Sequence, residues 1–498
     1  MTIGRGRKIG KWVRPAWAWV WVFGLAGSPL VVRAEAVSME AASPPAALRW
    51  WESAAGSWEW AFVSAREPAA DTAAGADSLD LGAVVARALA RYPAMAAVQA
   101  SRDQAYAAVG EARSAWLPSA SLDAGLTRFE EPMVVAPIHG FTPGSLPSFD
   151  RTLVQGGVSL GFTLWDGGAR GARIHRAAAA AASADAGVAA TEQDVAARAV
   201  LAYLRVLTLE DVLHAHGLRR QALESERQRV AQLMDQGKAA RVQLLRAQAS
   251  LSQAAAQRET TASQLELAVR DLGRLIGLTP DQVRAAGLRG VHWSGGAAAG
   301  RGALLERAKA DNPSLAQARQ SLASARAGTA EARARFFPRI GLAARQSEYG
   351  TGAGGFTGEW NAGVQVSYPL FAGGARFKAL DRASAGRRAA ESALALRDLA
   401  VQHDVDAALT SLASAGASVS ALTAAVAQFE EVARIEHLSL EAGAGVQTDY
   451  LTAEAELLQA RASLAQARHA EIAAHVELAQ AVGELSSAWI ERNLESNR

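Results

Sequence analysis

The sequence contains no cysteine, and this absence excludes several kinds of site at once. Without thiols, this 498-residue chain offers no disulfide, no thiolate metal ligand and no cysteine nucleophile, and we expect no lipid-bearing cysteine at its N-terminus. Aromatic residues are also scarce, at 6% of the chain, whereas alanine is abundant and arginine, glutamate and glutamine are scattered throughout. Such a composition is typical of long helices rather than of a packed α/β enzyme.

Net charge is nearly absent, because the formal value is only +2. Residues 1–36 hold six basic side chains and one acid, so without this segment the charge becomes +2 minus +5, or −3. A mildly acidic chain argues against nucleic acid as the main partner.

The N-terminus predicts a signal peptide over 1–36. A basic segment from Arg5 to Arg14 precedes an apolar stretch at 16–25, and the small-x-small pattern at 34–36 suits cleavage. An uncleaved membrane anchor over 16–32 is the alternative. Residues 37–78 predict a flexible extension, and we expect no transmembrane helix after it, so that any later membrane contact uses strands.

The rest of the chain contains one pattern twice. EARSAWLP at 111–118 matches EARARFFP at 331–338, and WDGGAR at 165–170 matches FAGGAR at 371–376. The offset changes from 220 to 206 because the first copy carries a long loop at 131–150 where the second has only about 349–358. The sequence therefore predicts a first structural repeat at 79–278, a linker at 279–301, a second repeat at 302–488 and a tail at 489–498.

Each copy predicts a helix, two strands, a long helix and a further helix. Alternating apolar and polar residues predict the strands, most clearly in the second strand of each copy. Proline-free stretches of about 67 residues, roughly 100 Å as helix, predict the long helices. The predicted strands are 119–129, 152–165, 339–349 and 358–371, and the predicted helices that follow them are 170–236, 238–277, 375–442 and 446–485.

Strands of about ten residues with one apolar face suit a tilted transmembrane β-strand. Four strands are too few to close a barrel, so we expect a β-barrel shared between chains. Five aromatic residues fall at helix–strand junctions and predict an aromatic girdle at the membrane interface. The alternative is that they fill the hydrophobic core where helix meets sheet. They are Trp116, Trp165, Phe336, Phe337 and Phe371.

The duplication, the paired strands, the W/F-x-G-G entry to a long helix and the later glycine turn resemble the TolC-type outer membrane efflux protein family, over about 79–488. The resemblance implies a mainly α fold with a membrane β-barrel part. It implies a homotrimer with a twelve-strand β-barrel in the Gram-negative outer membrane and a twelve-helix periplasmic α-barrel. The implied partners are outer membrane lipid, a periplasmic adaptor protein and an inner-membrane ABC transporter or proton-driven pump.

Mapped onto that family, the turns near Gly237, Gly443 and Gly445 lie at the periplasmic tip, where members keep a closed iris. Asp449 matches an inward-facing carboxylate of the family, which predicts a periplasmic constriction; a solvated or helix-capping aspartate is the alternative. In the exporter prototype of the family, a tyrosine, an arginine and an aspartate form a polar network at the gate. The corresponding residues here are Leu440, Gly445 and Gln243, so this network is missing.

No catalytic, cofactor or metal constellation is visible, and His214 and His216 fall on different helix faces. We therefore expect a channel and not an enzyme. Its predicted function is the exit duct for type I protein secretion, because dedicated drug-efflux members often carry a lipid-modified cysteine. A multidrug efflux channel is the alternative, and a surface coiled-coil structural protein is a remote one.

Overall fold

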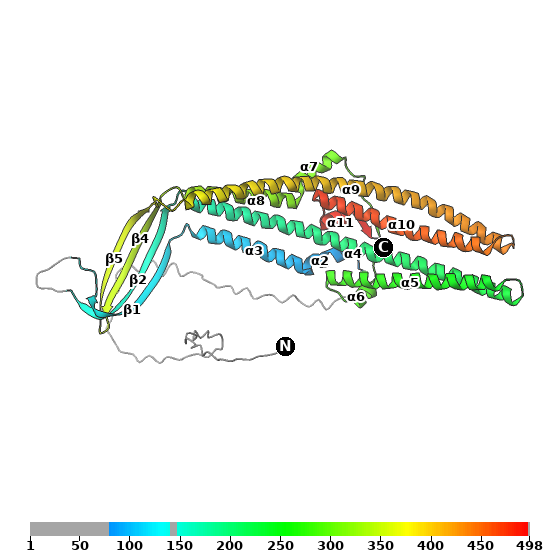
Figure 1. The fold of residues 1–498 in the computed structure, drawn as a ribbon, viewed down its shortest axis with the longest axis horizontal. Helices are drawn as coiled ribbons and strands as arrows, with labels where there is room; N and C mark the ends of the chain where they lie inside the picture. The colour runs from blue at the N-terminus through cyan, green and yellow to red at the C-terminus, as the bar shows by residue number, and fades with distance from the viewer. Residues whose placement is uncertain (1–78, 140–146, 497–498) are drawn as a thin grey trace, which may run out of the picture. The chain divides into compact units, whose positions relative to one another are not determined.

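The computed structural model describes residues 79–139 and 147–496, all within one compact unit. The signal peptide predicted over 1–36 and the extension predicted over 37–78 lie outside the described residues, as does the middle of the loop predicted over 131–150. The two halves repeat the same order of elements, which confirms the duplication (Figure 1). The first half contains α2 (Leu81–Arg91), α3 (Pro93–Ser114), β1 (Ser119–Val134), β2 (Phe149–Trp165), α4 (Ala169–Asp235) and α5 (Arg241–Ile276). The second contains α7 (Arg301–Asp311), α8 (Pro313–Ala334), β4 (Arg339–Thr351), β5 (Gly354–Ser367), α9 (Ala375–Glu441) and α10 (Gln447–Val482).

The two longest helices, α4 and α9, contain 67 residues each and therefore extend for about 100 Å. Each follows a glycine in the left-handed region, Gly168 with φ 88° and Gly374 with φ 80°. A side chain would be strained in this conformation, so glycine lets the chain turn from strand into helix. The strands lie at one end of these helices and the turns into α5 and α10 at the other (Figure 1).

The four long strands form one antiparallel sheet in the order β1-β2-β4-β5. The pairing of β2 with β4 joins the two halves of the chain. β1 and β5 are the edges of this sheet, and among the described strands neither has a partner on its outer side. An isolated sheet with two open edges cannot satisfy its backbone hydrogen bonds inside a membrane.

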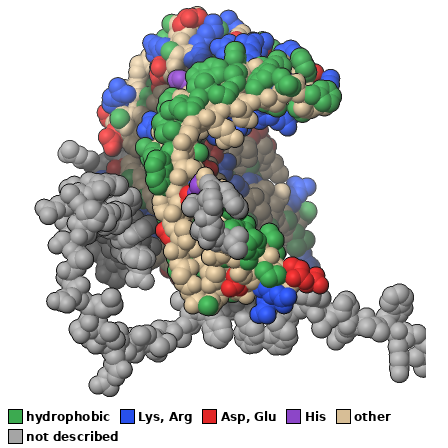
Figure 2. All heavy atoms as spheres, turned by 90° about the vertical axis from the view of Figure 1, so that its left-hand side faces the viewer, with side chains coloured by type: hydrophobic (Ala, Val, Ile, Leu, Met, Phe, Trp, Pro, Cys, Tyr) green, Lys and Arg blue, Asp and Glu red, His purple; other side chains and the backbone are tan. Residues whose placement is uncertain are grey.

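One face of the sheet is apolar. Leu122 lies opposite Val158, Phe162 lies opposite Leu342, and Leu342 lies opposite Val364. Residues paired directly across strands share a face, so these side chains form an apolar surface, which Gln346 and Glu348 of β4 interrupt. Figure 2 looks onto the strand end and shows hydrophobic side chains gathered along the curved sheet.

The opposite face is polar. Ser121 lies opposite Ser159, Ser159 opposite Arg345, and Arg345 opposite Asn361. The hydroxyl oxygens of Ser121 and Ser159 are 2.8 Å apart, which is a hydrogen bond across the strands. A sheet with one apolar and one polar face is suited to separate lipid from water.

The observed bounds differ from the predicted ones mainly in the strands. The four long helices begin and end within three residues of their predicted limits. β1 runs five residues past the predicted 119–129 and includes Pro132, which is tolerated because β1 is an edge strand whose register shifts between Arg128 and Met133. β5 ends at Ser367 rather than at 371, because Pro369 has no N–H to donate to a ladder.

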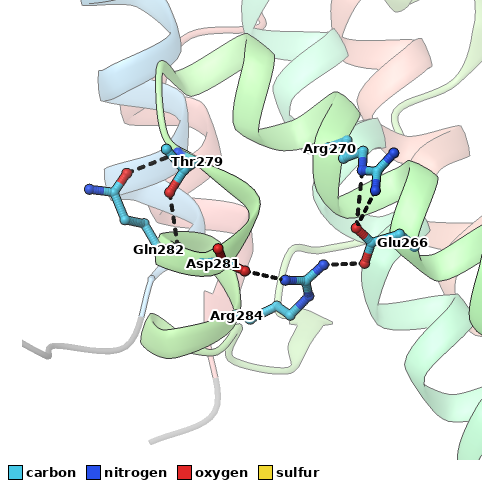
Figure 3. A network of polar contacts seen from close by, with 6 residues as sticks. All are labelled: Glu266, Arg270, Thr279, Asp281, Gln282 and Arg284. Atoms are coloured by element: carbon cyan, nitrogen blue, oxygen red, sulfur yellow. Dashed lines mark hydrogen bonds and ion pairs between the residues drawn. The ribbon is translucent and has the colours of Figure 1, made fainter.

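The linker predicted over 279–301 contains regular structure, α6 (Pro280–Ala286) and β3 (Val291–Trp293). Thr279 caps α6, because its Oγ1 accepts from the Gln282 N–H at 3.3 Å while Gln282 Oε1 accepts from the Thr279 N–H at 2.9 Å. The Arg284 guanidinium pairs with Asp281 and with Glu266 of α5, as Figure 3 shows. These contacts hold α6 against α5.

The tail predicted over 489–498 is also structured in its described part. α11 (Ser487–Asn493) begins two residues before the predicted tail and β6 (Leu494–Ser496) lies within it. β6 pairs with β3, in the region predicted as a linker. Trp489 and Ile490 are buried in the main hydrophobic cluster, which explains why this end of the chain is ordered. Both elements are too short to show a sequence period.

The main hydrophobic core surrounds the middle of α4, where it is joined by α2, α5, α10 and α11. Tyr203 is fully buried there, and its hydroxyl lies 2.7 Å from the Arg289 carbonyl and 3.0 Å from that of Leu79. The hydroxyl also accepts from the Arg289 N–H at 2.9 Å. Tyr203 therefore holds residue 79 and the linker residue 289 against α4. Burial raises the pKa of the Tyr203 hydroxyl.

α9 contains a stretch that is long and apolar enough to cross a membrane, and none of that stretch is buried. We expected no such helix after the N-terminal segment, and by length and composition this expectation was wrong. The stretch is apolar because residues 407–429 contain no charged side chain. Only four of the 67 residues of α9 are buried, against eighteen in α4, so α9 has a largely uncovered surface.

Candidate functional site

Two regions hold the predicted site residues: the junctions between helices and strands, and the turns at the far end of the long helices. At the first junction, the Arg170 guanidinium lies 4.1 Å from the centre of the Trp116 ring. At the second, the Arg376 guanidinium lies 5.6 Å from the centre of the Phe336 ring. The two pairs occupy equivalent positions in the duplication, so each half of the chain contains a cation–π contact at its junction. In the second half, Arg376 also lies 5.3 Å from the centre of the Tyr368 ring.

Both arginines also bind the segment that precedes their helix, which is the end of β2 for Arg170 and the loop after β5 for Arg376. An NH2 group of Arg170 donates to the Leu164 carbonyl, and that of Arg376 donates to the Leu370 carbonyl, each at 3.2 Å. The first junction has an additional carboxylate, because Asp166 accepts from the Arg170 backbone N–H at 2.9 Å and pairs with its guanidinium at 3.4 Å. Ala372 stands at the equivalent position of the second junction.

This difference predicts unequal effects of the same substitution. Arg170→Met leaves the buried Asp166 carboxylate without its cation and should destabilise the protein by about 3–5 kcal/mol. Arg376→Met is the matched control, and we expect a smaller loss of about 1–2 kcal/mol because no carboxylate is left behind. Thermal unfolding of the purified protein in detergent measures both. Equal losses would contradict the role given to Asp166.

The predicted girdle residues are brought to the same end of the molecule. The Trp165 and Phe337 rings meet edge to face at 5.9 Å, and Phe336 meets Phe377 at 5.3 Å. Trp116 remains 50% exposed and Phe371 87% exposed, so neither is a fully buried plug. Phe377 was missed by the sequence analysis, although it lies on the first turn of α9. The membrane role of these rings stays a prediction.

The predicted tip glycines make the turns at the opposite end. Gly237 and Gly443 have φ values of 72° and 75°, in the left-handed region that ends helices. Gly445 has no such φ, but an added Cβ would lie 2.8 Å from the Leu440 nitrogen. Each of the three positions therefore requires glycine for a local structural reason.

Asp449 lies in the first turn of α10 and is exposed. The helix begins after Val446 without a side-chain cap, so Asp449 is not the capping residue proposed as its alternative role. Its Oδ1 accepts from the Thr448 hydroxyl at 3.3 Å. Gln243 corresponds to the aspartate of the prototype's gate network. Here it caps α5, because its Oε1 accepts from the Ala240 N–H at 3.0 Å.

Sequence reasoning missed a polar cluster close to these turns. The buried Glu226 carboxylate pairs through both oxygens with Arg229, at 2.8 and 2.9 Å, and Tyr450 of α10 lines the same cavity of about 340 Å³. Burial, with the charges of Glu454 and Glu226, raises the pKa of Tyr450 to about 12, so its hydroxyl stays protonated. The His437 ring of α9 lies 5.5 Å from the Tyr450 ring. The three-residue spacing of Glu226 and Arg229 on a predicted helix is the sequence feature that could have indicated this ion pair.

The described residues contain no group of three or more His, Asp or Glu side chains placed to hold a metal ion. His216 and His469 are half-buried, and burial lowers the pKa of both. His469 Nδ1 lies 2.8 Å from the Thr208 hydroxyl, which gives this histidine a structural partner.

Comparison with known proteins relates this fold to membrane channels. A family profile described as "Outer membrane efflux protein" matches residues 84–278 and 304–484, one segment in each half of the chain. The chain is 25% identical over 439 residues to the outer membrane protein TolC of Vibrio cholerae, covering 85% of this chain and 95% of that relative. It is 26% identical over 307 residues to the alkaline protease secretion protein AprF of Pseudomonas aeruginosa. That match covers 60% of this chain and 63% of AprF, slightly less than two thirds of its length.

Solved structures share the fold at lower identity. The outer membrane protein VceC of Vibrio cholerae has a TM-score of 0.69 at 18% identity, over 81% of this chain and 96% of that one. The outer-membrane channel OprN has a TM-score of 0.68 at 20% identity, over 81% and 90%. These relatives are channel and secretion proteins and not enzymes, as the sequence predicts.

Proposed function

The chain belongs to the outer membrane efflux protein family, and on this premise we propose that it is the passive exit duct of a type I protein secretion system. At the coarser level it is an outer membrane efflux channel that extends into the periplasm. The observation that carries the proposal is the sheet, which has one apolar face, one polar face and two open edges above helices of about 100 Å.

The open edges support a homotrimer. β1 and β5 lie on opposite sides of the sheet, so pairing β5 of one protomer with β1 of the next would satisfy both edges. Such a head-to-tail contact closes into a ring when the rotation is right. Three copies provide a barrel of twelve strands, with the apolar face toward lipid and the polar face toward the lumen.

The helices below the sheet would line a periplasmic tunnel in the same assembly. The partners of this tunnel are a periplasmic adaptor protein at its tip and an inner-membrane ABC transporter that supplies the energy. The duct contributes no chemistry of its own, which agrees with the absence of a catalytic constellation in the sequence.

One observation supports protein cargo over drugs. The relative AprF is named for the secretion of an alkaline protease. The similarity to TolC and to the outer membrane efflux protein BepC of Brucella suis, 24% identical over 70% of this chain and 76% of that one, favours small-molecule efflux as the second candidate.

Deleting the gene in its host tests the cargo. We expect specific proteins to disappear from the culture medium, while susceptibility to drugs changes by no more than about twofold. Reintroducing the gene should restore secretion. Increased susceptibility to several drugs with an unchanged set of secreted proteins would instead establish the efflux role.

The membrane orientation gives a second expected result. An epitope tag inserted after Ala136, in the loop between β1 and β2, should bind antibody on intact cells, because this loop lies at the far end of the strands from the helices (Figure 1). A tag inserted after Lys238, in the turn between α4 and α5, is the control and should be reached only after the outer membrane is broken. The reverse pattern would refute the orientation.

A further inference from the structure

Positive charge is concentrated where the helices meet the strands. Four segments surround this junction, 111–118, 165–176, 326–339 and 375–391, and together they hold thirteen Lys or Arg and five Asp or Glu. Their net charge is therefore +8, while the whole chain carries +2, which leaves −6 for the remainder. Figure 2 shows Lys and Arg side chains gathered beside the hydrophobic side chains of this end.

A groove of about 450 Å³ lies within this basic region, between α4, α8 and α9. Arg176, Arg335 and Arg382 line it, one from each of the three segments that form its walls. Its floor is made of small residues, including Ala325, Gly328 and Ala383. An added Cβ at Gly328 would meet only the Arg176 side chain, at 4.0 Å, so the groove is open above this residue.

The acids of the region do not neutralise the groove. Glu331 is the acidic residue in its lining, and its carboxylate already pairs with Arg173 at 3.4 Å and with Arg176 at 3.3 Å. Arg335 and Arg382 are exposed and make no ion pair or side-chain hydrogen bond within the described residues. Two guanidinium groups therefore remain available to an anion from outside the protomer.

If the sheet spans the membrane with its apolar face toward lipid, the groove lies next to the headgroup layer on the side of the helices. Arg335 directly follows α8 and precedes β4 by four residues, and Arg382 lies seven residues into α9, about 10 Å along the helix. The headgroup layer of a bilayer is about 5–8 Å thick on each side, and long arginine side chains reach along apolar surface toward it. The apolar face of the sheet begins directly above these residues.

From this juxtaposition we propose that the groove binds the phosphate headgroup of an anionic glycerophospholipid of the periplasmic leaflet. Arg335 and Arg382 bind the phosphate oxygens through charge-assisted hydrogen bonds, and the small-residue floor accommodates the glycerol backbone. The site would fix the height of the barrel in the membrane. This inference rests on the outer membrane location of the channel. It does not depend on whether the exported cargo is a protein.

Lipid titration of the full-length protein in detergent, followed by native mass measurement, tests the proposal. The probes are cardiolipin, zwitterionic phosphatidylethanolamine and inorganic phosphate. We expect cardiolipin to bind at least about tenfold more tightly than phosphatidylethanolamine, and millimolar phosphate not to displace it. Juxtamembrane arginines contribute about fivefold each, so Arg335→Gln with Arg382→Gln should weaken cardiolipin binding about 25-fold.

Two further variants separate charge from folding. The lysine pair, Arg335→Lys with Arg382→Lys, should retain most of the binding because it keeps both charges. Arg246→Gln with Arg258→Gln removes two exposed arginines of α5, far from the strands, and should leave binding unchanged. Equal binding of the two lipids, displacement by phosphate, or an equal loss in the α5 control would overturn the proposal. Because none of these readouts involves cargo, a failed secretion test leaves this one intact.

Discussion

Replacing Leu396 and Leu399 of α9 with aspartate should abolish assembly while leaving the individual protomer able to form its own core. These leucines are 69% and 62% exposed in the isolated chain, and neither belongs to a hydrophobic cluster of the protomer. They lie three residues apart on the same helix face, in the part of α9 nearer the strands. Because only four of the 67 residues of α9 are buried in the protomer, we expect these exposed leucines to lie in a protein–protein interface.

The expected magnitude follows from burial. Burying a leucine stabilises a contact by about 1.5–3 kcal/mol, so each interface should lose about 3–6 kcal/mol, or more than a hundredfold in its equilibrium constant. Burying two unpaired carboxylates adds a further cost. Native mass measurement in detergent should therefore show the monomer instead of the proposed trimer.

Leu396→Met with Leu399→Met is the matched control, because it keeps an apolar side chain of similar volume at both positions. We expect it to assemble as the unaltered protein does. A stable trimer of the aspartate variant would contradict the interface, and a stable, channel-forming monomer of the unaltered protein would contradict the shared barrel.

The helices and the duplication could be predicted from the sequence because their signals are long and repeated. Both 67-residue helices extend over many turns without proline, and the glycine pair before the first recurs before the second, 206 residues later. The end of β5 was harder, because the apolar alternation continues through Leu370 although Pro369 cannot take part in the ladder. The extension of β1 through Pro132 depends on its place at the sheet edge, which only the strand order reveals.

The parts of the site that were missed depend on contacts between distant segments. Tyr450 and Glu226 are separated by more than two hundred residues, and nothing in either sequence window indicates that they line one cavity. Likewise, Trp489 and β6 gain their order from packing against the linker strand and the main core, far away in the chain. Local periodicity predicts which face of an element is apolar, but not which element will cover it.

Asp449→Asn should reduce the preference of the channel for cations. Asp449 is exposed in the first turn of α10, beside the Gly443 turn, and three-fold symmetry would place three copies of its carboxylate around one axis. At an assumed distance of about 8 Å from that axis, three carboxylates raise the local concentration of a monovalent cation about tenfold even at the dielectric constant of water. Planar bilayer recordings measure the effect as the ratio of cation to anion permeability.

Asp235→Asn provides the matched control, because Asp235 is an exposed aspartate at the other helix turn of the same end. If the α9–α10 turn lines the constriction and the α4–α5 turn lies outside it, only Asp449→Asn should bring the permeability ratio down toward unity and weaken block by multivalent cations. Trimer stability should stay unchanged in both variants, since neither aspartate is buried. An unaltered permeability ratio in Asp449→Asn, or equal effects of the two substitutions, would show that Asp449 does not line the narrowest part of the channel.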